Sequence, residues 1–446
     1  MDRAMLYRTI WRWHFYAGLF VTPFILLLAT TGSLFLFKPQ IDAWEESALR
    51  GPPLSAGKVM ASADARVAAA LAAAPGATVR NYRLPRDASA PAVVTLDLPN
   101  SAGQREVFVS ASGQVTASVD PEQRWSNWIQ RLHGSLLLGL PGGLLVEAAA
   151  SWAIVLILSG LYLWWPRGRR FAGVVWPRLS GGRLMWRDLH AVTGFWVSGL
   201  ALVLLLSGLP WTDGWATAFR VVRQQVGWVN AGPQDWKGGM ALGGHASHAD
   251  DAVMAVPADH DHHHASGQTF ASIALRAERE HLPFPVIIQP PHAPSRFGPP
   301  NGPDWKVSSE AQNRPLIRSI TYDAHSGAVT GRQGFADKHL IDRVINYGIA
   351  WHEGQLFGWV NQLVGLLTGI ALLLIAISGT IMWWRRRSPG AGLDAPPLPA
   401  GRGRALLLIL VIPALFLPMM LLSLIIVAIA DGLAGLIWRQ GALASP

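Results

Sequence analysis

"WRWHFYAGLFVTPFILLLATTGSLFLF", residues 11–37, places His14 at the start of an apolar stretch that runs almost unbroken to Phe37. An α-helix rises about 1.5 Å per residue, so about 20 apolar residues cross the hydrocarbon of a bilayer. The stretch is longer than the apolar segment of a signal peptide and lacks a small-x-small cleavage site before Lys38. It therefore predicts a retained membrane-spanning helix.

The composition of the whole chain agrees with a membrane protein. Of 446 residues, 50% are hydrophobic and only 15% are charged, and the mean hydropathy is positive, which is unusual for a soluble enzyme. Apolar runs long enough to span a bilayer lie near 15–37, 144–165, 189–211, 359–384 and 405–430. The predicted fold class is an α-helical integral membrane protein with about five transmembrane helices.

The formal net charge of +9 comes largely from arginines that flank the apolar runs. This distribution is the positive-inside pattern and indicates a lipid bilayer rather than a nucleic-acid partner. It places the N-terminus, 166–188 and 385–404 in the cytoplasm, and 38–143 and 212–358 outside. The arginines concerned are Arg3, Arg8, Arg12, Arg167, Arg169, Arg170, Arg178, Arg183, Arg187, Arg385, Arg386 and Arg387.

The chain contains no cysteine. This excludes disulfides, iron–sulfur clusters, covalently attached c-type haem and thiolate zinc sites. A bound metal must therefore use histidine, carboxylate or methionine ligands.

An internal repeat relates the first span to the third and the second to the fourth. In the first and third spans a histidine is followed by glycines four and eighteen residues later: His14, Gly18 and Gly32, and His190, Gly194 and Gly208. The second pair shares a glycine at +6, a Ser-Gly step ending at +27 and a Trp-Trp pair at +31 and +32, counted from His133 and His352. These shared offsets indicate duplication of one unit.

The segments outside the membrane repeat as well. Each offers a helix, near 59–74 and 269–281, followed by short alternating strands and a Ser-Gly hairpin turn. The predicted layout has two small α+β domains: 1–37 span; 38–123 first outer domain; 124–165 His-bearing helix and span; 166–188 basic loop; 189–211 span; 212–345 second outer domain with a His-rich insertion at 245–264; 346–384 His-bearing helix and span; 385–404 loop; 405–430 span.

Four histidines occupy matched positions of this repeat. The topology places His14 and His190 just inside the cytoplasmic face and His133 and His352 on the outer side, so they form two pairs. Two imidazoles facing each other across a helix bundle make an axial site for noncovalent haem, which a chain without cysteine can hold. Gly18 and Gly194, one helical turn further along, would leave room beside each imidazole for a flat macrocycle.

Other histidines and arginines leave alternatives open. A single histidine beside interfacial tryptophans is often a headgroup anchor. Arg124, Trp125 and Arg131 near His133 could contact an anionic ligand, haem propionates or lipid headgroups. The His-rich insertion could capture Ni, Cu or Zn weakly or be passive low-complexity sequence. Its histidines are His245, His248, His260, His262, His263 and His264.

With these residues the chain resembles the PepSY-associated transmembrane family, iron-regulated membrane proteins that include ferric-siderophore reductases of bacterial inner membranes. The resemblance covers about residues 8–388 and rests on "WRWHFYAGL", "RLHGSLLLG", "WRDLHAVTGFW", "WHEGQLFG" and the two outer domains, which look like PepSY modules. The His-rich insertion and the fifth span depart from the shorter members.

The resemblance implies two b-type haems, held by the four matched histidines, that carry electrons across the inner membrane to a periplasmic ferric siderophore or other iron chelate. The electron donor would be cytoplasmic or the quinol pool. No catalytic acid or base is expected, and the protein would be a membrane oxidoreductase. Two rival classes are a haem-free PepSY scaffold or regulator that binds a periplasmic partner, and a metal-uptake protein that uses the His-rich loop.

Overall fold

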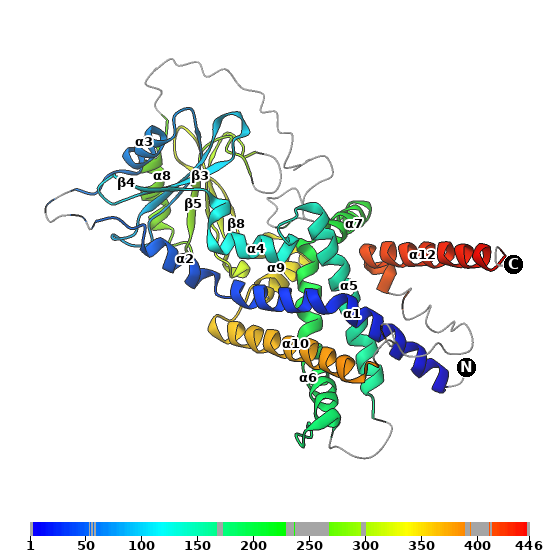
Figure 1. Ribbon diagram of the computed structural model, residues 1–446. Helices are drawn as coiled ribbons and strands as arrows, with labels where there is room; N and C mark the ends of the chain where they lie inside the picture. The colour runs from blue at the N-terminus through cyan, green and yellow to red at the C-terminus, as the bar shows by residue number, and fades with distance from the viewer. Residues whose placement is uncertain are drawn as a thin grey trace. The chain divides into compact units, whose positions relative to one another are not determined.

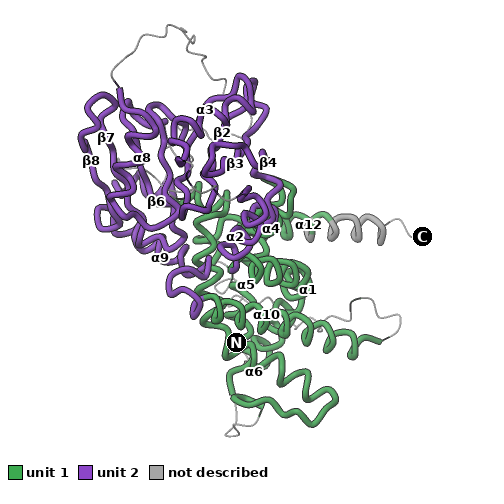
Figure 2. The backbone as a smooth tube through the Cα atoms, turned by 90° about the vertical axis from the view of Figure 1, so that its left-hand side faces the viewer, with its two compact units in different colours: residues 1–36, 130–219, 362–446 green, residues 37–129, 220–361 purple. Residues whose placement is uncertain are grey.

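The computed structural model describes residues 3–52, 54, 57, 59–166, 173–228, 236, 267–295, 300–388, 393, 410 and 413–443, without the side chains of 3, 431, 432 and 434–443. These residues divide into two compact units, shown in different colours in Figure 2. Residues 1–36, 130–219 and 362–446 make up unit 1, and residues 37–129 and 220–361 make up unit 2.

Unit 1 is built from long apolar helices (Figure 1). They are α1 (Arg3–Phe35), α5 (Leu140–Trp164), α6 (Gly182–Gly208), α10 (Trp359–Arg386) and α12 (Pro418–Leu443). In lipid a backbone must satisfy its hydrogen bonds internally, which a continuous helix does. Within the described ranges, four helices are long and apolar enough to cross a membrane: Ala4–Phe35, Leu140–Trp164, Gly182–Trp211 and Trp359–Arg386.

The fifth predicted span, 405–430, lies partly outside the described residues. Its described helical part, Pro418–Ala430, is apolar but shorter than a full crossing. The start of α12 nevertheless packs into unit 1, because the indole of Trp152 donates to the hydroxyl of Ser423 at 2.9 Å. Met420 on α12 is fully buried.

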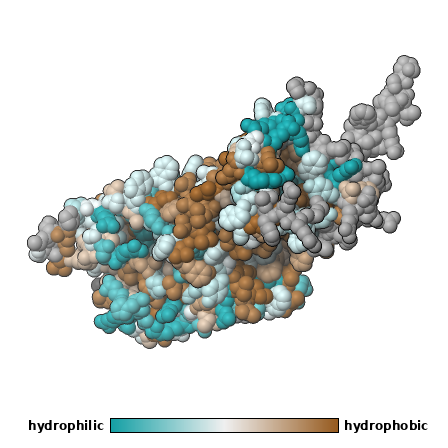
Figure 3. Space-filling view, turned by 90° about the horizontal axis from the view of Figure 1, so that it is seen from below, coloured by the Kyte–Doolittle hydropathy of each residue, from teal (hydrophilic) through white to brown (hydrophobic). Residues whose placement is uncertain are grey.

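The helices of unit 1 keep many large apolar side chains on their outer surface. Figure 3 shows broad areas of apolar surface on the face that it presents. A soluble monomer rarely exposes so much contiguous apolar area, whereas a lipid-facing helix does. Among the exposed side chains are Leu19, Phe20, Leu26, Leu200, Val203, Leu206, Leu363, Leu367 and Ile370.

Unit 2 is an α+β structure in which eight strands form a single sheet. The strands are β1 (Thr78–Arg83), β2 (Ala92–Asp97), β3 (Gln104–Val109), β4 (Val115–Val119), β5 (Val286–Gln289), β6 (Trp305–Ser309), β7 (Ser319–Tyr322) and β8 (Val329–Gln333). Their order is β4-β3-β2-β1-β5-β6-β7-β8, with all neighbours antiparallel.

The sheet corrects the expectation of two separate small domains. Each predicted outer segment supplies one four-stranded meander, but β1 and β5 pair along the middle, with Tyr82 opposite Ile288 and Arg83 opposite Ile287. A backbone bond from Leu84 N to Val286 O, 3.0 Å long, extends the seam. Pairing these two strands removes two exposed edges that separate domains would leave open.

One face of the sheet forms the core of unit 2 with helices α3 (Ala63–Ala73) and α8 (Phe270–Arg279). Strand residues alternate between the two faces, so every second side chain points to these helices. Tyr82, Val94, Val107, Ile288 and Val307 are at most 1% exposed on this face. Both halves of the repeat thus share one hydrophobic core.

Four further short helices are α2 (Lys38–Ser47), α4 (Trp125–Ser135), α7 (Asp213–Gln225) and α9 (Leu340–His352). The chain turns between α4 and α5, where Leu136 and Leu137 have positive φ angles of 54° and 61°. Gly139 follows with a φ of 62°, and α5 begins at Leu140. His133 therefore lies on a helix of its own and not on the span.

Gly369 gives a test of the contact between α10 and α1. A Cβ added there would lie 3.4 Å from the Ala29 carbonyl and closer still to the hydroxyl of Ser33. We expect Gly369→Val to lower the thermal stability of the detergent-solubilised protein, because overpacking costs about 1–3 kcal/mol. The matched control is Gly199→Val in α6, where a Cβ meets nothing within 4 Å. Equal melting temperatures for the two variants would contradict this packing.

Candidate haem site

His14 on α1 and His190 on α6 lie next to each other in unit 1. Their ring centres are 6.4 Å apart and the ring planes are perpendicular. Metal–imidazole nitrogen bonds are about 2 Å long, so two imidazoles on opposite sides of one metal have ring centres roughly 6 Å apart. The observed separation therefore suits two axial ligands of one iron.

The partner of His190 fixes which ring nitrogen carries the proton. Nδ1 of His190 lies 2.9 Å from the carbonyl oxygen of Ile375 on α10. A carbonyl can only accept, so Nδ1 must carry the hydrogen and donate it. Nε2 of the neutral ring then keeps a free lone pair, which is the form that binds a metal.

His14 is held in the same way by α5. Its Nδ1 lies 2.9 Å from the hydroxyl of Ser159, and that hydroxyl is 3.2 Å from the Leu156 carbonyl. The hydroxyl can donate its single hydrogen to Leu156 and accept from Nδ1, which again leaves Nε2 with its lone pair. In this arrangement both Nε2 atoms have a lone pair that a metal ion could bind.

Glycines of the neighbouring spans make room for both rings. A Cβ at Gly160 would lie 3.3 Å from Cε1 of His14, and a Cβ at Gly379 would lie 3.3 Å from Cε1 of His190. The Ser-Gly steps that mark the repeat, Ser159-Gly160 and Ser378-Gly379, are therefore where each histidine rests. The spacing of these steps marks the repeat in the sequence but does not predict that they contact the histidines.

Gly18 and Gly194, predicted to leave space beside the imidazoles, do not contact them. A Cβ at Gly18 would meet only Leu156, at 3.9 Å, and a Cβ at Gly194 would meet nothing within 4 Å. The open space at Gly194, one helical turn from His190, is compatible with a flat group lying there. The role of these two glycines stays a prediction.

His133, at the end of α4, makes a third contact of the same type within unit 1. Its Nδ1 lies 3.1 Å from the hydroxyl of Thr31, which is also 2.8 Å from the Leu27 carbonyl. A Cβ at Gly32 would lie 3.0 Å from Cε1 of His133. The His133 ring thus packs against a hydroxyl residue followed by a glycine, Thr31-Gly32, as His14 and His190 pack against Ser-Gly steps.

His352 is the last residue of α9 and belongs to unit 2. A buried ion pair anchors this helix, because Arg223 donates to Asp342 at 2.7 Å. The indole of Trp236 donates to the other carboxylate oxygen of Asp342 at 2.9 Å, and the Arg223 side chain lies over the Trp236 ring. Arg223 and Trp236 are 0% exposed. The pairing of His352 with His133 stays a prediction.

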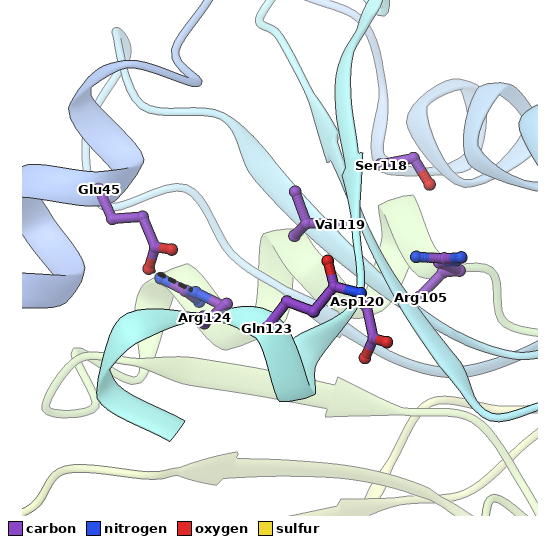
Figure 4. A pocket seen from close by; sticks show the side chains of 7 residues that line it. All are labelled: Glu45, Arg105, Ser118, Val119, Asp120, Gln123 and Arg124. Atoms are coloured by element: carbon purple, nitrogen blue, oxygen red, sulfur yellow. Dashed lines mark hydrogen bonds and ion pairs between the residues drawn. The ribbon is translucent and has the colours of Figure 1, made fainter. Parts of the chain in front are cut away.

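Arg124 is engaged by carboxylates of unit 2. It lies 3.0 Å from Glu45, 2.8 Å from Glu46 and 3.0 Å from Glu106. Burial lowers the pKa of Arg124, but the carboxylates outweigh it and the net direction is upward. Figure 4 shows Arg124 with Glu45 at the side of a polar pocket of about 260 Å³. This arginine organises α2 against β3.

The remaining predicted metal ligands lie outside the described residues. They are the histidines of the insertion, His245, His248, His260, His262, His263 and His264. In the part of the chain that the structure does describe, no group of three or more His, Asp or Glu side chains is arranged so that it could hold a metal ion.

A comparison with protein families identifies the family of the chain. The model of the PepSY-associated TM region matches residues 11–386. The chain belongs to the PepSY-associated transmembrane family. No curated protein matches the sequence. The matched range contains all four repeat-related histidines of this PepSY-associated protein, and it ends before α12.

The Asp342 anchor of α9 can be tested through stability. Asp342→Ala would leave Arg223 buried without its partner, and such a loss costs about 3–5 kcal/mol. We expect a large fall in the melting temperature. Glu278→Ala on α8, where the side chain is exposed, is the control and should have little effect.

A double variant tests whether apolar side chains can replace the Arg223–Asp342 ion pair without loss of stability. Arg223→Met with Asp342→Leu replaces the ion pair by apolar side chains and should recover much of the lost stability, because buried pairs often gain little over apolar packing. A double variant as unstable as Asp342→Ala would contradict this account.

Proposed function

We propose that this PepSY-associated protein holds b-type haem between His14 and His190 and moves electrons across the bacterial inner membrane. The observation that carries the proposal is that the two imidazole ring centres lie 6.4 Å apart. Their Nδ1 atoms are engaged by Ile375 and Ser159, as second-shell partners of metal-bound histidines usually are.

The chemistry of the donors fits this group. Two neutral imidazoles are common axial ligands of noncovalent haem, and a chain with no cysteine cannot attach haem covalently. When bound, the haem supplies a reversible one-electron carrier. The residues of the chain orient the ligands: Ser159 and Ile375 fix the tautomers, and Gly160 and Gly379 allow the rings to approach the neighbouring helices.

The proposed reaction is the one-electron reduction of Fe(III) to Fe(II) in a ferric chelate, such as a ferric siderophore, on the periplasmic side. The electron would come from a cytoplasmic donor or from the quinol pool. Fe(II) is a poorer partner than Fe(III) for hard oxygen ligands, so reduction loosens the chelate, and no protein acid or base is needed. The family resemblance supports this substrate class.

The proposal includes a second haem held by His133 and His352. His133 has the hydrogen-bonding pattern of the inner pair through Thr31, and His352 is its repeat-related counterpart in the sequence. The haem content of the purified protein tests the second site, because two sites predict two haems per chain.

The first experiment is a visible spectrum of the purified protein, oxidised and dithionite-reduced, with haem quantitation. We expect the sharp reduced bands of low-spin b-type haem. His14→Ala and His190→Ala should each remove about one haem per chain. His325→Ala, which changes an exposed residue in the β7–β8 turn, should leave the haem content unchanged.

Two outcomes would end the proposal. A colourless protein from haem-replete cells would redirect attention to the scaffold class and to a search for a periplasmic partner. An unchanged haem content in both His14→Ala and His190→Ala would remove this pair as ligands.

A further variant tests the hydrogen bond between His14 and Ser159. Ser159→Ala removes the acceptor of the His14 Nδ1 hydrogen, which makes the imidazole a weaker electron donor to iron. We expect haem to be retained while its midpoint potential rises on the order of tens of millivolts. Ser198→Ala is the matched control, since the Ser198 hydroxyl donates only to a carbonyl of its own helix, Phe195. Equal potentials in wild type and Ser159→Ala would show that the contact does not tune the site.

A further inference from the structure

The face of the β5–β8 meander that points away from the hydrophobic core is polar. Along β6, Val307 faces the core, so its neighbours Lys306 and Ser308 point to the other side. The same alternation applies to β5, β7 and β8 through the register. The polar side chains on this face are Gln289, Lys306, Ser308, Ser319, Thr321 and Gln333, and Ile287, which is paired with Ser308, is the apolar one.

One row of this face crosses four strands. Gln289 pairs with Lys306, Lys306 pairs with Thr321, and Thr321 pairs with Gly331. Directly paired residues in an antiparallel sheet share a face and lie about 5 Å apart. The row therefore presents an amide, an ammonium and a hydroxyl in line, and ends at a glycine.

The repeat supplies an internal comparison for this row. In the other meander the equivalent positions are Arg83, Val93, Phe108 and Ala117, in the same register. Val93 is 2% exposed and Phe108 is 0% exposed, and Arg83 is paired with Glu46 at 2.9 Å. One half of the duplicated sheet uses this row for apolar packing, whereas the other half lines it with polar groups.

Lys306 lacks an ion pair although it is partly buried. Within the described ranges no carboxylate lies within salt-bridge distance of its ammonium, and Gln289, Ser308, Ser319 and Thr321 have no side-chain hydrogen bond. Burial lowers the pKa of Lys306, and the more distant charge of Glu310 opposes this only in part. A desolvated ammonium is stabilised by an anion that also accepts hydrogen bonds from its neighbours.

Two acidic side chains flank Lys306 along the chain, one at each end of β6. Glu310 follows the strand and is exposed, and Asp304 precedes it, with its carboxylate accepting a hydrogen bond from Thr330 at 2.7 Å. Gly331 keeps the β8 end of the row clear, because a Cβ there would lie 2.7 Å from the Thr321 hydroxyl. The centre of the row is thus cationic and hydrogen-bonding.

We propose that the row Gln289–Lys306–Thr321 binds a carboxylate group of a small organic anion. Lys306 supplies the charge, and the Gln289 amide and the Thr321 hydroxyl donate to the carboxylate oxygens from either side. If the protein reduces ferric chelates, this row holds carboxylates of the chelate, a step that rests on the proposed function. The binding of the anion itself does not depend on haem.

The test uses the full-length protein in detergent with citrate as the probe. Equilibrium dialysis with radiolabelled citrate should show saturable binding, and Lys306→Gln should weaken it at least about tenfold, since a charge-assisted hydrogen bond is lost. Lys306→Val, which copies the repeat-related Val93, should do the same. Arg318→Gln removes an equal charge from an exposed residue of the same unit and should change the affinity less than about twofold.

Competition and folding controls complete the experiment. Ferric citrate should compete with citrate, whereas inorganic phosphate should compete much less, and equal competition by phosphate would overturn the assignment to carboxylates. The melting temperature shows that each variant is folded. Absence of citrate binding to the wild type, or equal weakening by Lys306→Gln and Arg318→Gln, would also overturn the proposal.

The two proposals fail independently. A protein that binds citrate through Lys306 but contains no haem keeps the anion site and loses the electron-transfer function. A protein that contains haem but does not bind citrate would support the proposed electron-transfer function and exclude this anion site.

Discussion

The contact of a histidine ring with a hydroxyl–glycine step of a neighbouring helix is the interaction on which the membrane unit depends. His14 rests on Ser159-Gly160 and His190 on Ser378-Gly379, with Nδ1 bonded in each case. In lipid there is little hydrophobic force between helices, so small residues and polar contacts decide where they meet. The same contact that packs the helices also sets the tautomer and turns both Nε2 atoms into potential metal ligands.

Unit 2 depends on a different constraint, the need to pair strand edges. Four strands of one repeat would leave β1 exposed, and the second repeat would leave β5 exposed. Joining them at Tyr82 and Ile288 gives one sheet with a shared core under α3 and α8. The two rows on the other face of the sheet differ: Val93 and Phe108 are buried in one, and Lys306 and Thr321 make the other polar.

Much of the candidate site could be predicted from the sequence. The offsets from His14 and His190 identified both histidines as a matched pair, and the structure places their rings side by side. The chemistry of the second shell could not be predicted, because Ser159 and Ile375 are far from their histidines in sequence and a backbone carbonyl leaves no sequence signal. Gly18 and Gly194 were selected by helical spacing, but the glycines that touch the rings come from other helices.

The sequence by itself determined the membrane class and predicted an internal repeat and a histidine pair, because apolar length and residue spacing are local properties of a linear chain. Only the tertiary structure decided that two strand segments form one sheet, that Lys306 lies in a polar row, and that Arg124 is enclosed by carboxylates. These features depend on which distant segments pair and on what surrounds a charge, and neither follows from the order of residues along the chain.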